Sequence, residues 1–288
     1  MRGRFHSTGT DQLFGSDYYD GYYTIQWLKS NGYADVWWFN GKVGSWGASA
    51  VGINQYCYAG QNVPELRAQY ISVASPMQYD HIYFQGGQFS YNMIMSWSSG
   101  QDSGNSAYNP ITNPHPSLDY ARNVIASHPV KDSWWVTRNL DMNNRWANVK
   151  QAAVHYGGWD DAFSEGTLNG FLGYSTYGDP SIRDKQVLIM GGIGHGYPVG
   201  DIAWQNYGAM NAPVGDWESR LFRTELYEDH GVRGSQSYES WWDAQTRVMY
   251  YVYSDPSYYG VDPLACSWRT GNAFPISPTT EQRMEWLS

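Results

Sequence analysis

The stretch from residue 42 to residue 52, KVGSWGASAVG, constrains the fold of this chain more than any other. Its apolar start predicts a short strand, and its small residues predict a sharp turn into a helix. Ser49 stands at the apex, where a strained serine backbone needs small neighbours, as in a nucleophile elbow. The strict G-x-S-x-G spacing requires glycine at Val51, and here Gly52 follows one place later. A strand-turn-helix junction with an incidental serine therefore stays open until partner residues are found.

Composition limits the classes of protein and partner. With 42% hydrophobic and 16% charged residues among 288, the chain has the composition of a globular protein with a sizeable core. A net charge of −9 without any basic run argues against nucleic acid and anionic membranes as partners. No apolar run approaches the length of a membrane span. The scarcity of lysine, with five residues, hints at an extracytoplasmic location but leaves the compartment undecided.

The order of predicted elements indicates an α/β architecture. Buried strands are predicted at residues 66–75, 149–156 and 185–190, and a helix at residues 162–174. Strands and helices in alternation, with polar residues at the carboxyl ends of the strands, predict a doubly wound, mostly parallel sheet. Residues 77–148 differ in composition and are rich in Asn, Ser, Met and aromatic residues. We interpret them as an inserted helical cap above a site.

Three predicted strands end near chemically reactive side chains. These are Ser49, Asp161 and His195, in that chain order, which is the order of the α/β-hydrolase fold. A serine hydroxyl is a poor nucleophile until a histidine takes its proton, and a carboxylate must orient the imidazole and stabilise its charged form. A single histidine after a strand is more often a capping or core residue. Three members in the correct order favour catalysis.

Several segments resemble the Xaa-Pro dipeptidyl-peptidase and cocaine esterase family of serine hydrolases. The similarity lies in RGR at 2–4 with Ser7 and Gly9, DGYYTIQWL at 20–28, NGKVG at 40–44, GASAVG at 47–52, GWDDAF at 158–163 and GH at 194–195. The resemblance implies an α/β-hydrolase fold with a helical cap and without a cofactor or metal. It implies Ser49 as nucleophile, Asp161 as triad acid and His195 as base, with the backbone N–H of Ala50 as one oxyanion donor.

The resemblance also implies a domain organisation. Residues 1–76 and 149–240 would form the two parts of the hydrolase core, residues 77–148 the cap, and residues 241–288 the beginning of a β jelly-roll whose first strand is residues 248–253. Family members begin with further strands and a loop whose tyrosine is a second oxyanion donor, and these would precede Met1. We therefore expect this chain to need a second polypeptide for full activity. A homo-oligomer stays open.

The substrate pocket is less clearly marked. The candidates are Trp159, Asp160, Phe163, Tyr83 and Phe84, and plain packing is the commoner role for the cap aromatics. Asp160 stands where the family usually has an aromatic residue, so we expect it to line the pocket or to be solvated. Related α-amino-acid ester hydrolases place acidic residues two and three positions after the triad acid to hold an ammonium. Phe163 and Ser164 occupy those positions here, although Glu165 follows them.

Three functions remain open from the sequence. The leading one is a serine hydrolase that cleaves an ester, amide or peptide bond through an acyl-enzyme. The second is an Xaa-Pro dipeptidyl-peptidase, which needs an anionic subsite that the sequence does not identify. The third is a non-catalytic fragment or one piece of a split hydrolase. The remaining histidines and the two cysteines, Cys57 and Cys266, lack the paired spacing of a metal site. His155, inside a predicted strand, is interpreted as a hydrogen-bonded core residue.

Overall fold

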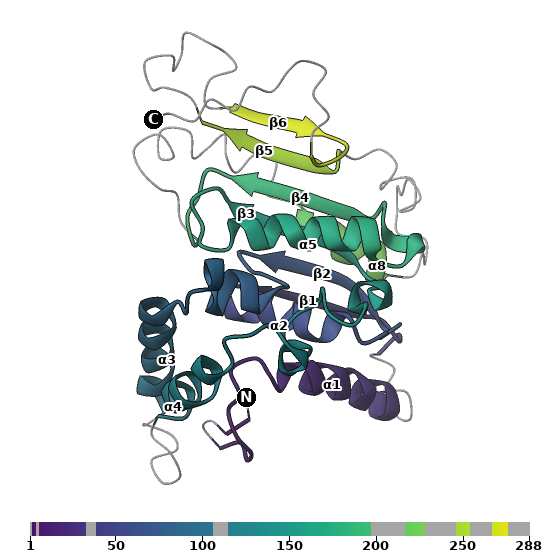
Figure 1. The fold of residues 1–288 in the computed structure, drawn as a ribbon. Helices are drawn as coiled ribbons and strands as arrows, with labels where there is room; N and C mark the ends of the chain where they lie inside the picture. The colour runs from purple at the N-terminus through teal and green to yellow at the C-terminus, as the bar shows by residue number, and fades with distance from the viewer. Residues whose placement is uncertain are drawn as a thin grey trace.

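A six-stranded sheet forms the centre of the molecule (Figure 1). The computed structural model describes residues 2–3, 6–32, 39–105, 115–196, 217–227, 246–253 and 267–275. The strands are β1 (Val43–Ala48), β2 (Leu66–Ser72), β3 (Ala152–Gly158), β4 (Gln186–Gly191), β5 (Val248–Val252) and β6 (Ser267–Gly271). They lie side by side in sequence order; β1 to β5 are parallel, and β6 is antiparallel to β5. Their carboxyl ends, except that of β6, therefore meet at one edge of the sheet.

Helices cover both faces of this sheet. The described α-helices are α1 (Asp17–Gly32), α2 (Ala50–Ala59), α3 (Tyr91–Asn105), α4 (Pro116–Asn123), α5 (Ser164–Tyr177) and α8 (Trp217–Leu226). Short helical turns are η1 (Tyr79–Tyr83), η2 (Gln85–Gly87), η3 (Ile125–Ser127), η4 (Ser133–Trp135), η5 (Arg145–Asn148) and η6 (Pro180–Ile182). None of the helices in the described ranges is long and apolar enough to cross a membrane.

Alternation along β2 shows which helices lie on which face. Ile71 packs with residues of α2 and α5, whereas Ala68 and Tyr70 pack with Leu221 of α8. Because successive side chains of a strand point to opposite faces, α2 and α5 cover one face and α8 covers the other. Each layer buries mainly aliphatic and aromatic side chains, including Tyr56 of α2 on the first face. The sheet is thus buried on both sides, as expected for parallel strands.

The segment between β2 and β3, which the sequence analysis assigns to a cap, contains only helices and turns in its described part. Figure 1 shows α3 and α4 on the side toward which the arrows of β2 and β4 point. Asp102 of α3 joins the two helices, because its buried carboxylate accepts hydrogen bonds from the backbone N–H groups of Ser117 (3.0 Å) and Leu118 (2.9 Å) in the first turn of α4.

Strand β5 corrects one expectation. The sequence analysis assigns residues 248–253 to the first strand of a jelly-roll, but β5 pairs in parallel with β4 and extends the central sheet. Val248, Met249 and Tyr251 are buried there. The composition of a buried strand does not encode which sheet it joins, because that choice depends on distant partners. Residues 241–245, 254–266 and 276–288, also assigned to the jelly-roll, lie outside the described residues.

Candidate active site

The predicted elbow is present at the end of β1. The strand ends at Ala48, α2 begins at Ala50, and Ser49 between them has φ 56° and ψ −124°. A positive φ is uncommon for a residue with a side chain and stores strain. The N–H of Ser49 donates to the carbonyl of Ser72 at the end of β2 (3.0 Å), which fixes the turn to the neighbouring strand. The elbow therefore presents the serine hydroxyl at the carboxyl edge of the sheet.

The glycines of the elbow are required by close contacts. A Cβ at Gly52 would lie 2.8 Å from the Cβ of Ala74 and 2.9 Å from the carbonyl oxygen of Ser72. A Cβ at Gly47 would lie 2.6 Å from a methyl of Val51. Val51 itself is 52% exposed, so glycine is not needed at its position. The shifted glycine spacing thus follows from the way α2 packs against β2.

Asp161 and His195 lie beyond the ends of β3 and β4. The N–H of Trp159 donates to the carbonyl of Gly191 (3.0 Å), and the N–H of Asp160 donates to that of Ile193 (3.2 Å). These bonds continue the β3–β4 pairing past the strand ends and bring the two loops together. Gly158 allows this approach, because a Cβ there would collide with the backbone of Ile193. Residues distant in sequence are thereby fixed side by side.

A continuous hydrogen-bond chain joins the three predicted residues. Nε2 of His195 lies 2.7 Å from Oγ of Ser49, and Nδ1 lies 2.6 Å from Oδ1 of Asp161. The Asp161 side chain is fully buried, whereas that of His195 is 44% exposed. The hydrogen bond to Asp161 raises the pKa of His195, burial of the ring opposes this, and the charge of Asp161 adds to it. The arrangement can take a proton from the serine hydroxyl.

A cavity of about 290 Å³ opens beside this chain. Its walls come from the N-terminal segment, the elbow with the start of α2, the segment after β2, the residues just before α5 and the loop after β4. The lining residues are Phe14, Ser49, Ala50, Ile53, Ile82, Tyr83, Met93, Ile94, Trp97, Ala162, Phe163 and His195. Phe163 also packs edge-on against the imidazole of His195, with ring centroids 5.3 Å apart. Ala50 is the first residue of α2, and the N–H groups of a first helical turn have no carbonyl partner within the helix.

Two of the five predicted pocket residues, Tyr83 and Phe163, line this cavity. Phe84 is instead buried among cap aromatics, stacked on Tyr79. Trp159 donates its indole N–H to the carbonyl of Tyr251 (2.7 Å). Asp160 is exposed and accepts a hydrogen bond from the hydroxyl of Tyr253 (2.5 Å). Trp159 and Asp160 therefore contact the β5 side of the sheet, away from the lining residues.

The sequence did not identify Phe14 as a pocket residue, and it did not distinguish Trp97 from the other aromatic residues of the cap. Phe14 lies in a segment that the sequence marks as a polar, Gly-rich loop. Its backbone is left-handed, with φ 66°, and so is that of Leu13, with φ 42°. No local signal predicts a positive φ at two consecutive bulky residues. The position of Ile53 near the pocket, by contrast, can be predicted from the periodicity of α2 once the elbow is located.

His155 occupies the interior of β3, as predicted. It is fully buried, and its Nδ1 lies 2.7 Å from the hydroxyl of Tyr56. Burial lowers its pKa to about 3, so the ring is neutral at physiological pH. Among the residues that the structure describes, no group of three or more His, Cys, Asp or Glu side chains could hold a metal ion. Cys266 and His230 lie outside them.

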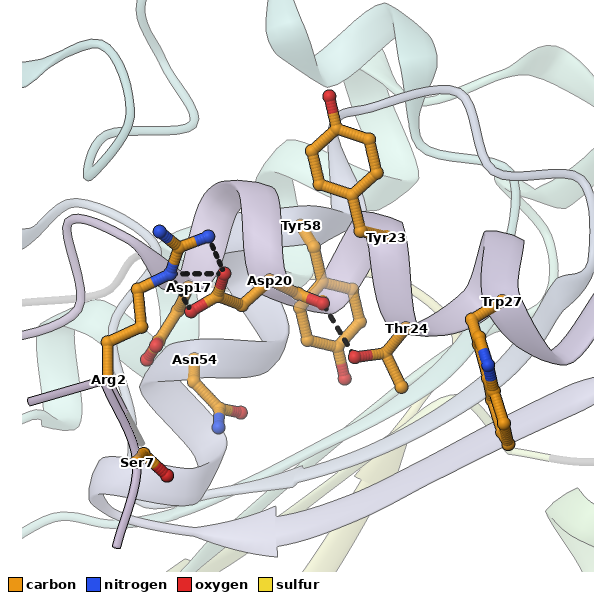
Figure 2. A pocket seen from close by; sticks show the side chains of 10 residues that line it. Arg2, Ser7, Asp17, Asp20, Tyr23, Thr24, Trp27, Asn54 and Tyr58 are labelled. Carbon is orange, nitrogen blue, oxygen red and sulfur yellow. Dashed lines mark hydrogen bonds and ion pairs between the residues drawn. The ribbon is translucent and has the colours of Figure 1, made fainter. Parts of the chain in front are cut away.

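A second, larger hollow of about 760 Å³ lies beside α1 and the adjacent side of α2 (Figure 2). Figure 2 shows Arg2 paired with Asp20, and the Nε–Oδ1 distance is 2.7 Å. Burial and the neighbouring carboxylates raise the pKa of Asp17 to about 6. Asp17 and Asp20 stand in the first turn of α1, where acidic side chains interact favourably with the helix dipole. The lining residues that the structure describes include no histidine, so they lack the nucleophile–base pair of the smaller hollow.

Comparison with known proteins gives independent information. The family described as X-Pro dipeptidyl-peptidase (S15 family) matches residues 1–197. Comparison with curated proteins finds no match. A solved structure of a CocE/NonD family hydrolase from Staphylococcus aureus is similar over 96% of this chain and 42% of its own, with a TM-score of 0.66 and 18% identity.

Two further solved structures also match over 96% of this chain. One is an α-amino acid ester hydrolase, with a TM-score of 0.56, 17% identity and 47% of its own length covered. The other is an aminopeptidase from a marine sediment Thaumarchaeota archaeon, with a TM-score of 0.53, 17% identity and 46% of its length covered. This chain therefore spans less than half the length of these three proteins.

At such low identity the solved structures support the fold alone, which here is a mostly parallel sheet with helices on both faces. The family match is stronger evidence, because it covers 197 of 288 residues and contains Ser49, Asp161 and His195. We conclude that this chain has the α/β-hydrolase fold and belongs to the X-Pro dipeptidyl-peptidase (S15) family.

Proposed function

We propose that this chain carries the catalytic centre of a serine hydrolase that cleaves a carboxylic ester or amide through an acyl-enzyme. The observation that supports it most directly is the hydrogen-bond chain of 2.7 Å and 2.6 Å from Ser49 through His195 to Asp161. The distances lie within the range expected of a nucleophile, a base and the group that orients the base. Membership of a hydrolase family agrees with this assignment.

In the first half-reaction, Oγ of Ser49 attacks the acyl carbonyl carbon while Nε2 of His195 takes the hydroxyl proton. The tetrahedral intermediate collapses when the bond to the leaving alcohol or amine breaks, and His195 returns its proton to that group. Water then attacks the acyl-enzyme, with His195 again as base, and releases the acid and free Ser49. Asp161 keeps Nδ1 protonated and stabilises the imidazolium. The N–H of Ala50 donates to the developing oxyanion.

Labelling with a fluorophosphonate probe tests the nucleophile. We expect the wild-type chain to be labelled and Ser49→Ala to lose the label. Ser103→Ala is the matched control, because Ser103 is an exposed serine on α3. Hydrolysis of p-nitrophenyl acetate should fall roughly a thousandfold or more in Ser49→Ala, since the residues of a triad act as a unit. Labelling that persists in Ser49→Ala would contradict the proposal. An unlabelled wild-type chain would also contradict it and would favour a non-catalytic role.

A second candidate is an Xaa-Pro dipeptidyl-peptidase, which the family description favours. Such an enzyme must hold the free α-ammonium of its substrate, which requires an anionic subsite. The lining of the cavity contains no carboxylate among the residues that the structure describes. We therefore expect faster turnover of p-nitrophenyl acetate than of Gly-Pro-p-nitroanilide. The opposite preference, dependent on Ser49, would establish the peptidase.

A further inference from the structure

The segment before α1 delivers an aromatic side chain to the candidate pocket through a strained turn. Leu13 and Phe14 both have positive φ, at 42° and 66°, although neither is glycine. Strain of this kind persists only where surrounding contacts fix the backbone, and it is often found at functional sites. Both side chains are buried, and Phe14 lines the cavity beside Ser49.

Several buried polar contacts hold this turn. Oδ1 of Asp11 accepts a hydrogen bond from the N–H of Leu13 (2.9 Å), and Oδ2 accepts one from the hydroxyl of Ser117 in α4 (2.7 Å). The guanidinium of Arg138 donates to the carbonyl of Gln12 (2.8 Å). Asp11 and Arg138 are each only 4% exposed. These groups fix the turn against the helical insertion, so the position of Phe14 is over-determined.

Phe14 meets an aromatic residue from the insertion. Its ring stacks on that of Trp97 in α3, with centroids 5.6 Å apart and an interplanar angle of 21°. Both rings line the cavity, so one wall of the pocket is a pair of rings from two distant parts of the chain. Rigid stacked rings limit the volume that a substrate group can occupy more firmly than flexible side chains do.

The pocket is also poor in charged side chains. Its described lining contains no Asp, Glu, Lys or Arg, and its ionisable side chains are His195 and Tyr83. The side chain of Glu165, two positions after Phe163, is 78% exposed, and its Oε1 lies 3.7 Å from Nε2 of His81. An ammonium group placed in this cavity would lose its hydration without gaining a charged partner.

We propose that the stacked pair Phe14–Trp97 determines acyl-group specificity, so that the pocket takes an uncharged apolar acyl group of limited length and rejects one with an α-ammonium. This inference rests on the proposed function and deepens it. It assigns the specificity to residues outside the hydrogen-bond chain, which makes the two separable by experiment.

The first test compares p-nitrophenyl acetate, butyrate, hexanoate and octanoate as substrates of the full chain, with kcat/KM as the readout. Phe14→Ala and Trp97→Ala should each raise the ratio of octanoate to butyrate at least about tenfold over wild type, because each removes one ring of the wall. Tyr91→Ala is the matched control, since Tyr91 is a 57% exposed aromatic on the same helix, and its ratio should not change. Phe14→Leu keeps bulk at the turn and covers the case in which Phe14→Ala does not fold.

Unchanged ratios in both wall variants, with activity that depends on Ser49, would overturn the specificity inference and leave the hydrolase intact. Ester hydrolysis that is equally fast in the wild type and in Ser49→Ala would instead overturn the proposed function.

A second test needs no turnover. Ligand-observed NMR should detect binding of neutral 3-phenylpropionamide and at least about tenfold weaker binding of phenylalaninamide, which adds an α-ammonium. Trp97→Ala should change the affinity for 3-phenylpropionamide, and Tyr91→Ala should not. Equal affinity for the two amides, or no effect of Trp97→Ala, would overturn the inference.

Discussion

At His195, three interactions set the charge of the imidazole. The hydrogen bond to Asp161 and the negative charge of that carboxylate favour the protonated ring, whereas partial burial favours the neutral one. The result is a pKa above the ordinary value of 6.5. A raised pKa makes the neutral ring a stronger base but reduces its population at low pH. The residue-scale consequence is a measurable pH limit on the proposed reaction.

The substitution Asp161→Asn tests this limit. In wild type, kcat/KM should rise with pH through a limb located above pH 6.5, because His195 of the free enzyme acts as a base only when neutral. In Asp161→Asn the limb should move to lower pH, since the interactions that raise the pKa are gone. The plateau should also fall by about 10⁴, because the tautomer is no longer fixed. A pH profile of p-nitrophenyl acetate hydrolysis with an unmoved limb would contradict the assignment of His195 as base.

Sequence reasoning located the residues that have local signals and missed those without one. Ser49 is marked by its small neighbours, and Asp161 and His195 by their positions after buried strands. Phe14 has no such mark, because its left-handed backbone is held by Arg138 and by the hydrogen bond from Ser117 to Asp11. Arg138 and Ser117 are more than a hundred residues away in sequence and reach the turn only when the chain folds. Tertiary contacts likewise determine where Trp159 lies, because its indole N–H donates to Tyr251 of β5.

At the scale of elements, the joint between β1 and α2 depends on contact distances at a few small residues. Gly52→Ala would place a Cβ 2.8 Å from the Cβ of Ala74 and 2.9 Å from the carbonyl oxygen of Ser72. We expect a loss of about 1–3 kcal/mol in the free energy of unfolding, the usual cost of overpacking. Val51→Ala, at a 52% exposed site in the same turn, is the control and should cost much less.

Urea denaturation of both variants measures this difference. Because Ser49 lies within the same turn, Gly52→Ala should also slow fluorophosphonate labelling, as small displacements at a nucleophile have large kinetic effects. Equal stability of the two variants would mean that α2 can shift away from β2 without cost.

The strands show a different limit of prediction. The residue pattern located β2, β3 and β4 to within a few residues, because each is a short, mainly apolar segment bounded by turn residues. The sequence also located β5, but it did not predict that β5 joins the central sheet. The parallel pairing with β4 joins segments about sixty residues apart, as in the pair Leu188–Val248. Local composition specifies that a strand forms, and the long-range packing of Met249 and Tyr251 specifies where.

At the scale of the whole molecule, buried ionisable groups set the response of stability to pH. The pKa of His155 in the folded chain is about 3, below the ordinary 6.5. As pH falls below 6.5, the unfolded chain therefore binds a proton at this residue and the folded chain does not, so the folded state loses stability. Burial also lowers the pKa of His81, with the same sign. Asp17 acts in the opposite direction, because its pKa of about 6 lets the folded state bind a proton before the unfolded state does.

The variant His155→Gln separates these contributions. In wild type, His155 should remove up to about 1.4 kcal/mol of stability per pH unit below pH 6.5, or about 2 kcal/mol between pH 7.5 and pH 5. The glutamine does not titrate, so His155→Gln should lose less stability over this range, even if the loss of ring packing against Tyr174 lowers its stability at pH 7.5. Asp17→Asn should steepen the acid loss, because it removes the compensating proton uptake. His6→Gln, at an exposed position, is the control. Urea unfolding at a series of pH values measures all four slopes, and a slope in His155→Gln equal to that of wild type would show that the core histidine is not the acid-sensitive group of this fold.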